Sequence, residues 1–277
     1  MNYEKLYKIK CEENKTLLKQ IETLEKKIAL LETAKGSQCS KNGNKYEKYV
    51  HDIVKNVFLN NKSFNNQCHK ELGGSCSTKN DMTCTLDGNN FGIEIKKFNA
   101  PDWVQCGIIY NTDEQRWEPG KKNKLPEKIR KFFKDIVNET ELFKGQLPPF
   151  LYQNLTYDEW LEIKNQTLLW DDFYIDIPRS TIRNMYKHKG CSYIQLSNGY
   201  GLYHLGEDIC NFEVPLFSVE QRIRGRIKVH SRKNKRGFCN LSVTLACQPK
   251  NITSLQPSKY SLDDISKLPK NLVHIPK

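Results

Sequence analysis

The segment 80–97 constrains the fold of this chain more than any other part of the sequence. Two short runs of β-forming residues flank the turn Asp-Gly-Asn-Asn at 87–90, an arrangement typical of a β-hairpin. Because side chains alternate between the two faces of a strand, Glu94 and Lys96 share one face, and the neighbouring isoleucines share the other. Asp81 opens the first strand, so the pattern predicts that the three charged residues meet at one end of the hairpin.

These residue types suit one kind of chemistry. Mg²⁺ takes oxygen ligands and keeps several waters, so Asp81 and Glu94 are candidate ligands for Mg²⁺, with Mn²⁺ as a substitute. Lys96 would position or activate a metal-bound water and neutralise charge on a phosphate. The predicted reaction is hydrolysis of a nucleic-acid backbone. The alternative is an exposed edge hairpin whose charges only keep it soluble.

The same residues resemble the PD-(D/E)XK nuclease superfamily, which has the restriction-endonuclease-like fold. Asp81 matches its first aspartate, Glu94 and Lys96 match its E-x-K, and Asn80 stands where the superfamily name has proline. Matching residues lie between about 43 and 110. The resemblance implies an α/β (α+β) core with a central mixed β-sheet flanked by helices. It also implies a metal-dependent deoxyribonuclease that hydrolyses DNA phosphodiester bonds.

Two more candidate residues come from this resemblance. Glu47 lies near the start of a predicted amphipathic helix at 40–58, where many members have a glutamate that assists the metal site; an acidic residue is also ordinary near a helix N-terminus. Gln105 lies in the segment 103–110, which we expect to form another strand closing the sheet. Some exonuclease members have a glutamine after the catalytic strand, but on a helix, so Gln105 is a secondary candidate.

The C-terminal part has a strictly alternating basic segment at 221–230. Its cations share one face of a predicted strand, its apolar residues share the other, and 238–246 is the expected antiparallel partner. A row of cations at this spacing favours contact with phosphates, although basic hairpins are also ordinary solvated surfaces. The predicted nucleic-acid-binding residues are Arg222, Arg224, Arg226, Lys228, His230 and Arg232.

The N-terminal part carries a heptad pattern. Apolar residues recur at alternating steps of four and three at Leu17, Ile21, Leu24, Ile28 and Leu31, which predicts a coiled coil and a homodimer. The helix could instead pack on its own domain. The expected organisation is a coiled-coil helix at 1–35, a linker at 36–42 and a nuclease domain at 43–277, divided into a catalytic core (43–124), a helical segment (125–190) and a β-rich basic DNA-contacting region (191–277).

Composition agrees with a polyanionic partner, since the 277 residues carry a formal net charge of +12. Ten cysteines without a C-x-x-C pair favour free thiols in a reducing compartment over disulfides or zinc. No membrane-length apolar run or secretory signal is visible, so we expect a soluble, intracellular protein. The positive charge and the nuclease resemblance together favour double-stranded DNA as its partner.

The whole layout is similar to predicted nucleases of large DNA viruses, which implies the host cytoplasm or the virion as its location. Two alternatives to a nuclease remain open at this point. One is a catalytically inactive DNA-binding or packaging protein on the same fold. The other is an interaction protein that assembles through its coil and has a merely soluble basic surface.

Overall fold

The computed structural model describes residues 10, 12–21, 23–24, 43–67, 80–120 and 124–276. The chain divides into two units, Met1–Lys45 and Tyr46–Lys277. In the first unit the described residues between 12 and 24 are helical, and the predicted coiled-coil residues Leu17, Ile21 and Leu24 are exposed. The other two coiled-coil positions, Ile28 and Leu31, and the linker 36–42 lie outside the described residues. The coiled coil therefore stays a prediction.

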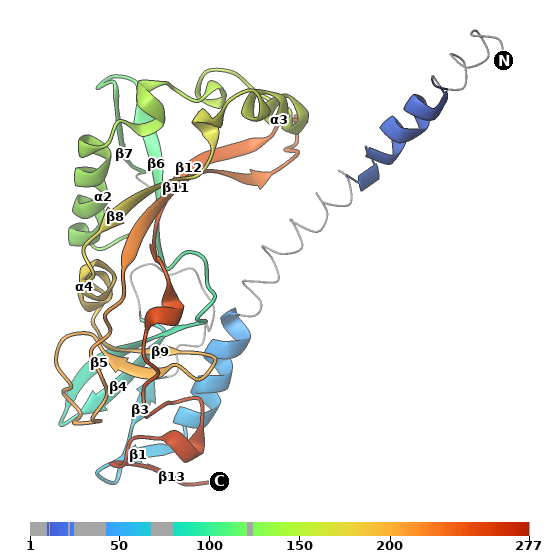
Figure 1. Cartoon of the computed structure of the whole chain (residues 1–277). Helices are drawn as coiled ribbons and strands as arrows, with labels where there is room; N and C mark the ends of the chain where they lie inside the picture. Colours follow the sequence, from blue (N-terminus) through green and yellow to red (C-terminus); the bar gives the residue numbers. More distant parts are fainter. Residues whose placement is uncertain are drawn as a thin grey trace. The chain divides into compact units, whose positions relative to one another are not determined.

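The predicted hairpin belongs to a five-stranded sheet, called here the hairpin sheet. The strand order across it is β10-β9-β5-β4-β3 (Figure 1). Strand β4 pairs with β5 antiparallel and β5 pairs with β9 parallel, so the sheet is mixed, as expected. Its strands are β3 (Asn65–Gln67), β4 (Met82–Leu86), β5 (Asn89–Lys96), β9 (Cys191–Leu196) and β10 (Gly201–His204).

The turn of the hairpin is shorter than the sequence alone indicated. Leu86 pairs with Asn89, so only Asp87 and Gly88 lie between the strands. Both have positive φ, 48° and 84°. A two-residue turn with two positive φ angles is the form that Asp-Gly favours, because its twist matches that of the strands. The turn therefore determines the register along the whole hairpin.

A second five-stranded sheet, called here the arginine sheet, has the order β7-β6-β12-β11-β8. Its pairings are all antiparallel. The expected partnership of the basic segment with the segment after it is confirmed, since β11 pairs with β12 along its length. Its strands are β6 (Val104–Asn111), β7 (Arg116–Pro119), β8 (Phe173–Ile177), β11 (Gln221–Ser231) and β12 (Asn240–Pro249).

The expectation that residues 103–110 close the catalytic sheet is wrong. These residues do form a strand, β6, but it pairs with β12 in the arginine sheet. The buried side chains of β6, Val104, Cys106 and Ile108, join a core that also contains Val243 and Leu245 of β12. Burial of this apolar face favours pairing with a strand nearly 140 positions away in the sequence.

Three α-helices lie in the segment predicted to be helical: α2 (Glu127–Glu139), α3 (Tyr157–Asn165) and α4 (Thr181–His188). The predicted capping box of α3 is present, with Thr156 and Glu159 each accepting a hydrogen bond from the other's backbone N–H. Buried residues of α2 and α4 pack in the same core as Ile223 of β11. In Figure 1 these two helices lie along one side of the arginine sheet.

A second core lies beneath the hairpin sheet. The helix predicted at 40–58 is shorter in the structure: residues 43–54 are helical, residues 57–58 belong to strand β1, and 40–42 lie outside the described residues. Its Val50 and Val54 pack with Ile93 and Ile95 of β5. A small sheet, in the order β13-β1-β2, is formed by β1 (Val57–Leu59), β2 (Lys62–Ser63) and β13 (Leu272–His274). Within the described part of the chain, no helix is both long enough and apolar enough to span a membrane.

Candidate active site

The structure brings Asp81, Glu94 and Lys96 together at the end of the hairpin. The Lys96 Nζ atom lies 2.6 Å from Glu94 Oε1 and 3.3 Å from Asp81 Oδ2. Asp81 also accepts a hydrogen bond of 2.8 Å from the backbone N–H of Ile95. Asp81 comes directly before Met82, which pairs with Ile93, so the register of the hairpin places its carboxylate beside Glu94. The predicted meeting of the three charged groups is therefore observed.

A second ammonium group joins this cluster. Lys189, the residue after helix α4, donates hydrogen bonds of 3.1 Å and 2.9 Å to the two oxygens of Glu94. The Cys191 thiol on β9 lies 3.8 Å from Glu94 Oε2. The side chain of Glu94 is only 2 % exposed and that of Lys189 only 9 %. The side chains of Lys96 and Asp81 are 18 % and 19 % exposed, so the cluster of two carboxylates and two ammonium groups is largely buried but open to solvent on the side of Asp81 and Lys96.

Sequence reasoning missed Lys189, because a lysine at the C-terminal end of a helix is ordinary. It reaches Glu94 because β9 lies parallel to β5, with Ile194 opposite Glu94. The ring of Tyr186 on α4 lies beside both ammonium groups of the cluster. Its centroid is 5.9 Å from Lys96 Nζ and 5.2 Å from Lys189 Nζ. These distances allow cation–π contact with both ammonium groups.

Electrostatics within the cluster assigns the charges. Burial acts to raise the pKa of Glu94, but Lys96 and Lys189 outweigh it and hold that pKa below its ordinary value. Burial acts to lower the pKa of Lys96, but Asp81 and Glu94 raise it well above its ordinary value. For Asp81, burial and the charge of Glu94 raise the pKa. Near neutral pH, Glu94 is therefore ionised and Lys96 is a cation rather than a base.

The donor set fits a hard divalent cation. Three oxygens surround Lys96 Nζ: one from Asp81, one from Glu94 and the backbone carbonyl of Ile95, which is 3.3 Å away. No cluster of three or more His, Cys, Asp or Glu side chains suited to a metal occurs among the described residues. Two carboxylates and a carbonyl leave positions for water, as Mg²⁺ prefers. A metal bound here would take over carboxylate contacts that the two lysines now make.

Gly92 makes room for the residue that precedes Asp81. A Cβ atom at position 92 would lie 2.8 Å from both Cβ and Cγ of Asn80, closer than side-chain atoms pack. The Asn80 side chain is in turn hydrogen-bonded by Thr83, at 3.0 Å. Close packing at Gly92 therefore helps to place Asp81.

We expect Gly92→Ala to force the Asn80 side chain aside and to destabilise the protein by about 1–3 kcal/mol, the usual cost of overpacking a closely packed site. The measurement is the free energy of unfolding in urea. Adding Asn80→Gly removes the atoms that the new methyl group meets, so the double variant should recover part of the loss. A single variant as stable as the wild-type protein would contradict this role.

The structure treats the two secondary candidates differently. Glu47 is half-buried on the helix at 43–54, whose apolar side packs on the Ile95 face of the hairpin sheet, and its role stays a prediction. Gln105 is exposed on β6, in the other sheet. The paired residues Gln105, Ala246 and Arg224 lie side by side across three strands of that sheet. The assignment of Gln105 to the carboxylate cluster is therefore corrected: it lies on β6, on the same face of the arginine sheet as Arg224.

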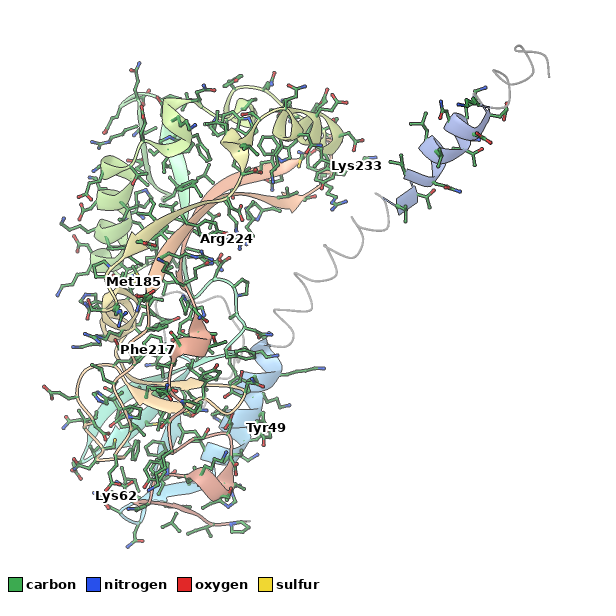
Figure 2. The ribbon with its side chains drawn as sticks, viewed as in Figure 1. Tyr49, Lys62, Met185, Phe217, Arg224 and Lys233 are labelled. Atoms are coloured by element: carbon green, nitrogen blue, oxygen red, sulfur yellow. The ribbon has the colours of Figure 1, made fainter. Side chains whose placement is uncertain are left out.

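The predicted alternation of β11 is observed from Gln221 to Arg226, whereas Ile227 is half-buried and Val229 is exposed, so the far end of the strand departs from it. Ile223 is fully buried in the core, whereas the cations on either side of it lie on the opposite face, half-buried or exposed. In Figure 2, Arg224 marks the middle of this strand and Lys233 the loop at its end. The face that bears the cations is called here the basic face.

Carboxylates neutralise part of the basic face. Asp102, whose side chain is 2 % exposed, lies 2.5 Å from Arg226 and 3.6 Å from Arg224, and Asp172 lies 2.6 Å from Arg224. These acids supply the anion that a row of cations requires. Arg222 contacts Gln248 and Tyr174 instead. The other residues predicted to bind nucleic acid are Lys228, His230 and Arg232. His230 shares a hydrogen bond with Ser242, and the Arg232 guanidinium lies over the ring of Tyr157.

Comparisons with known proteins give one similar structure. No family model matches the sequence, and no curated protein matches it either. A solved structure of the HhaI endonuclease in complex with DNA is similar to this chain at 18 % identity and a TM-score of 0.37, covering 75 % of this chain and 91 % of that one. A TM-score of this size does not establish a common fold, and the similarity to viral nucleases gains no support.

Proposed function

We propose that this protein is a Mg²⁺-dependent nuclease that hydrolyses phosphodiester bonds of DNA. The observation that carries the proposal is the cluster in which Lys96 Nζ lies 2.6 Å from Glu94 and 3.3 Å from Asp81. The pKa values of all three groups depart from their ordinary values, raised for Asp81 and Lys96 and lowered for Glu94. Ionisable groups that are largely buried and shifted by specific charged partners are candidates for a functional site.

Each residue has a distinct role in this proposal. Asp81 and Glu94 would hold the Mg²⁺ ion, which lowers the pKa of bound water and stabilises charge on the phosphate. Lys96 is a cation at neutral pH, so it orients the attacking water and neutralises the developing phosphate charge rather than accepting a proton. Lys189 holds Glu94 in place through both carboxylate oxygens. The Tyr186 ring stabilises both ammonium groups through cation–π contact.

DNA binding is the second part of the proposal. The basic face would lie along the phosphate backbone, with Arg222, Lys228, His230 and Arg232 as contacts, and Gln105 would take part from the neighbouring strand β6. Arg224 and Arg226 are engaged by Asp102 and Asp172, so they would contribute less. A homodimer formed through the heptads at 17–31 would present two such sites to a duplex.

The test is cleavage of supercoiled plasmid and of linear duplex DNA in Mg²⁺, in Mn²⁺ and in EDTA. We expect cleavage in both metals and none in EDTA, because two carboxylates alone provide no activated water. Nicking of the plasmid would identify an endonuclease, and shortening of the linear duplex an exonuclease. Cleavage that is equal in EDTA would contradict the metal-dependent mechanism.

One observation favours a different function. Lys96 and Lys189 already satisfy the oxygens of Glu94, so the cluster is stable as an ion network without a metal. A catalytically inactive DNA-binding or packaging protein would need nothing more. Intact but retarded DNA in every lane, with affinity that falls steeply as salt rises, would favour this second function.

A further inference from the structure

The basic face contains a hollow of about 490 Å³ that the cleavage site does not use. Three stretches of chain line it: residues 98–101, which follow the catalytic strand; Tyr174, Arg222 and Arg224 from β8 and β11; and residues 248–252 at the end of β12. A volume of this size lies within the usual range for small-molecule sites. Its walls combine cations, amides and aromatic rings rather than a continuous apolar surface.

A contact between an arginine and a tyrosine ring, called here the Arg222–Tyr174 platform, forms part of one wall of the hollow. The guanidinium carbon of Arg222 lies 4.0 Å from the centroid of the Tyr174 ring. Gln248 accepts a hydrogen bond of 2.8 Å from Arg222 Nε and donates one of 2.8 Å to the carbonyl oxygen of Pro101. This chain of contacts holds the guanidinium group over the ring. Stacked arginine and aromatic planes are the surfaces on which unpaired bases stack.

Three cations line the hollow, Arg222, Arg224 and Lys250, and no carboxylate lies among its lining residues. Arg224 is paired with Asp102 and Asp172, whereas the described contacts of Arg222 are an amide and a ring. The pair between Lys250 and Asp176 is 2.9 Å long but exposed, so it contributes little and can exchange for a phosphate.

The hollow is connected to the cleavage site by the chain itself. Phe98 and Pro101, which line it, follow Lys96 by two and five residues. Even a fully extended chain spans at most about 3.6 Å per residue, so these walls begin within roughly 7 to 18 Å of the Lys96 backbone. That span corresponds to about two to five base steps of ~3.4 Å along a strand.

We propose that this hollow is a subsite for one unpaired nucleotide of the strand that the enzyme cleaves. The base stacks on the Arg222–Tyr174 platform, and its phosphate contacts Lys250. The inference rests on the proposed nuclease function for the identity of the strand. It adds that the substrate presents an unpaired base a few nucleotides from the scissile bond, as in a single strand, a bulge or an extruded nucleotide.

The experiment compares two fluorescent single-stranded 12-mers in EDTA by anisotropy: one with bases and one of the same length built from abasic residues. Both have the same phosphates, so their difference in affinity measures base contacts. The wild-type protein should bind the strand with bases roughly 10-fold more tightly, the effect of stacking about one base. Tyr174→Ala should remove most of this preference, while the affinity for the abasic strand changes little. Arg222→Lys keeps the positive charge of a proposed phosphate contact and should also lower the preference for bases.

Tyr157→Ala is the matched control, because it removes a second arginine–tyrosine stack, with Arg232 at 4.2 Å, that does not line the hollow. It should keep the preference for bases. Equal binding of the two strands by the wild-type protein, or an unchanged preference in Tyr174→Ala and Arg222→Lys, would overturn the subsite. Because no metal is present, the result is independent of cleavage. If the two variants lose the preference for bases but the wild-type protein shows no Mg²⁺-dependent cleavage, the subsite is retained and the nuclease function is refuted. If the wild-type protein cleaves DNA but the variants keep the preference, only the subsite is refuted.

Discussion

Replacing Lys96 by alanine is expected to lower the rate of Mg²⁺-dependent DNA cleavage by roughly 10²–10⁴-fold, the usual contribution of a positioned catalytic group. The ammonium group lies among oxygens of Asp81, Glu94 and Ile95, so its removal takes away the cation to which the proposed function assigns the orientation of water and the neutralisation of phosphate charge. Glu94 remains paired with Lys189 in this variant, so the fold should be retained. The measurement is a single-turnover cleavage rate at saturating Mg²⁺.

Lys97→Ala is the matched control for this variant. Lys97 is the next residue in the chain and carries the same charge, but it follows the end of β5 and lies outside the cluster. Its replacement changes the net charge equally and should alter cleavage by less than about 3-fold, as expected for a substitution outside the reacting groups. DNA affinity in EDTA should stay close to the wild-type value in both variants. Equal losses of cleavage in the two would show that Lys96 acts only through overall charge.

Replacing Glu94 by alanine is expected to destabilise the protein by about 3–5 kcal/mol, because removing one partner leaves buried charges uncompensated. Two ammonium groups, from Lys96 and Lys189, depend on this carboxylate, whose side chain is only 2 % exposed. Asp81, 3.3 Å from Lys96, is the remaining acid in the cluster. The free energy of unfolding in urea at neutral pH measures the effect.

Two further variants make this stability prediction specific. Glu94→Ala combined with Lys189→Met removes one positive charge along with the negative one, and should recover part of the loss. Asp52→Ala breaks an exposed pair with Lys55, 2.9 Å long, and should cost less than about 1 kcal/mol. A Glu94→Ala protein as stable as Asp52→Ala would mean that the lysines find water or other partners when Glu94 is removed.

Local sequence pattern was sufficient for the hairpin and for the basic strand. The Asp87-Gly88 turn set the register, and the period of two placed Glu94 and Lys96 on one face, so their contact with Asp81 followed from short-range rules. The same alternation placed Ile223 in the core and the cations of β11 on the other face. These features depend on neighbours within about fifteen residues along the chain.

Longer-range pairing decided the features that local pattern missed. Strand β8, within the segment expected to be helical, pairs with β11 and supplies Tyr174 beside Arg222. Gln105 lies on the basic face because β6 pairs with β12. In each case several strand partners satisfy the same alternation, and burial of a common apolar core selects one of them.

By itself, the sequence determined which charged groups share a face of a strand, since that depends only on alternation and on the chemistry of a two-residue turn. Only the tertiary structure decided what surrounds them. The parallel pairing of β5 with β9 brings Lys189 to Glu94 across 95 positions, and the arginine sheet brings Asp102 to Arg226 across 124. Such contacts form because distant apolar faces are buried together, and periodicity shows which face of a strand is buried but not which distant strand lies beside it.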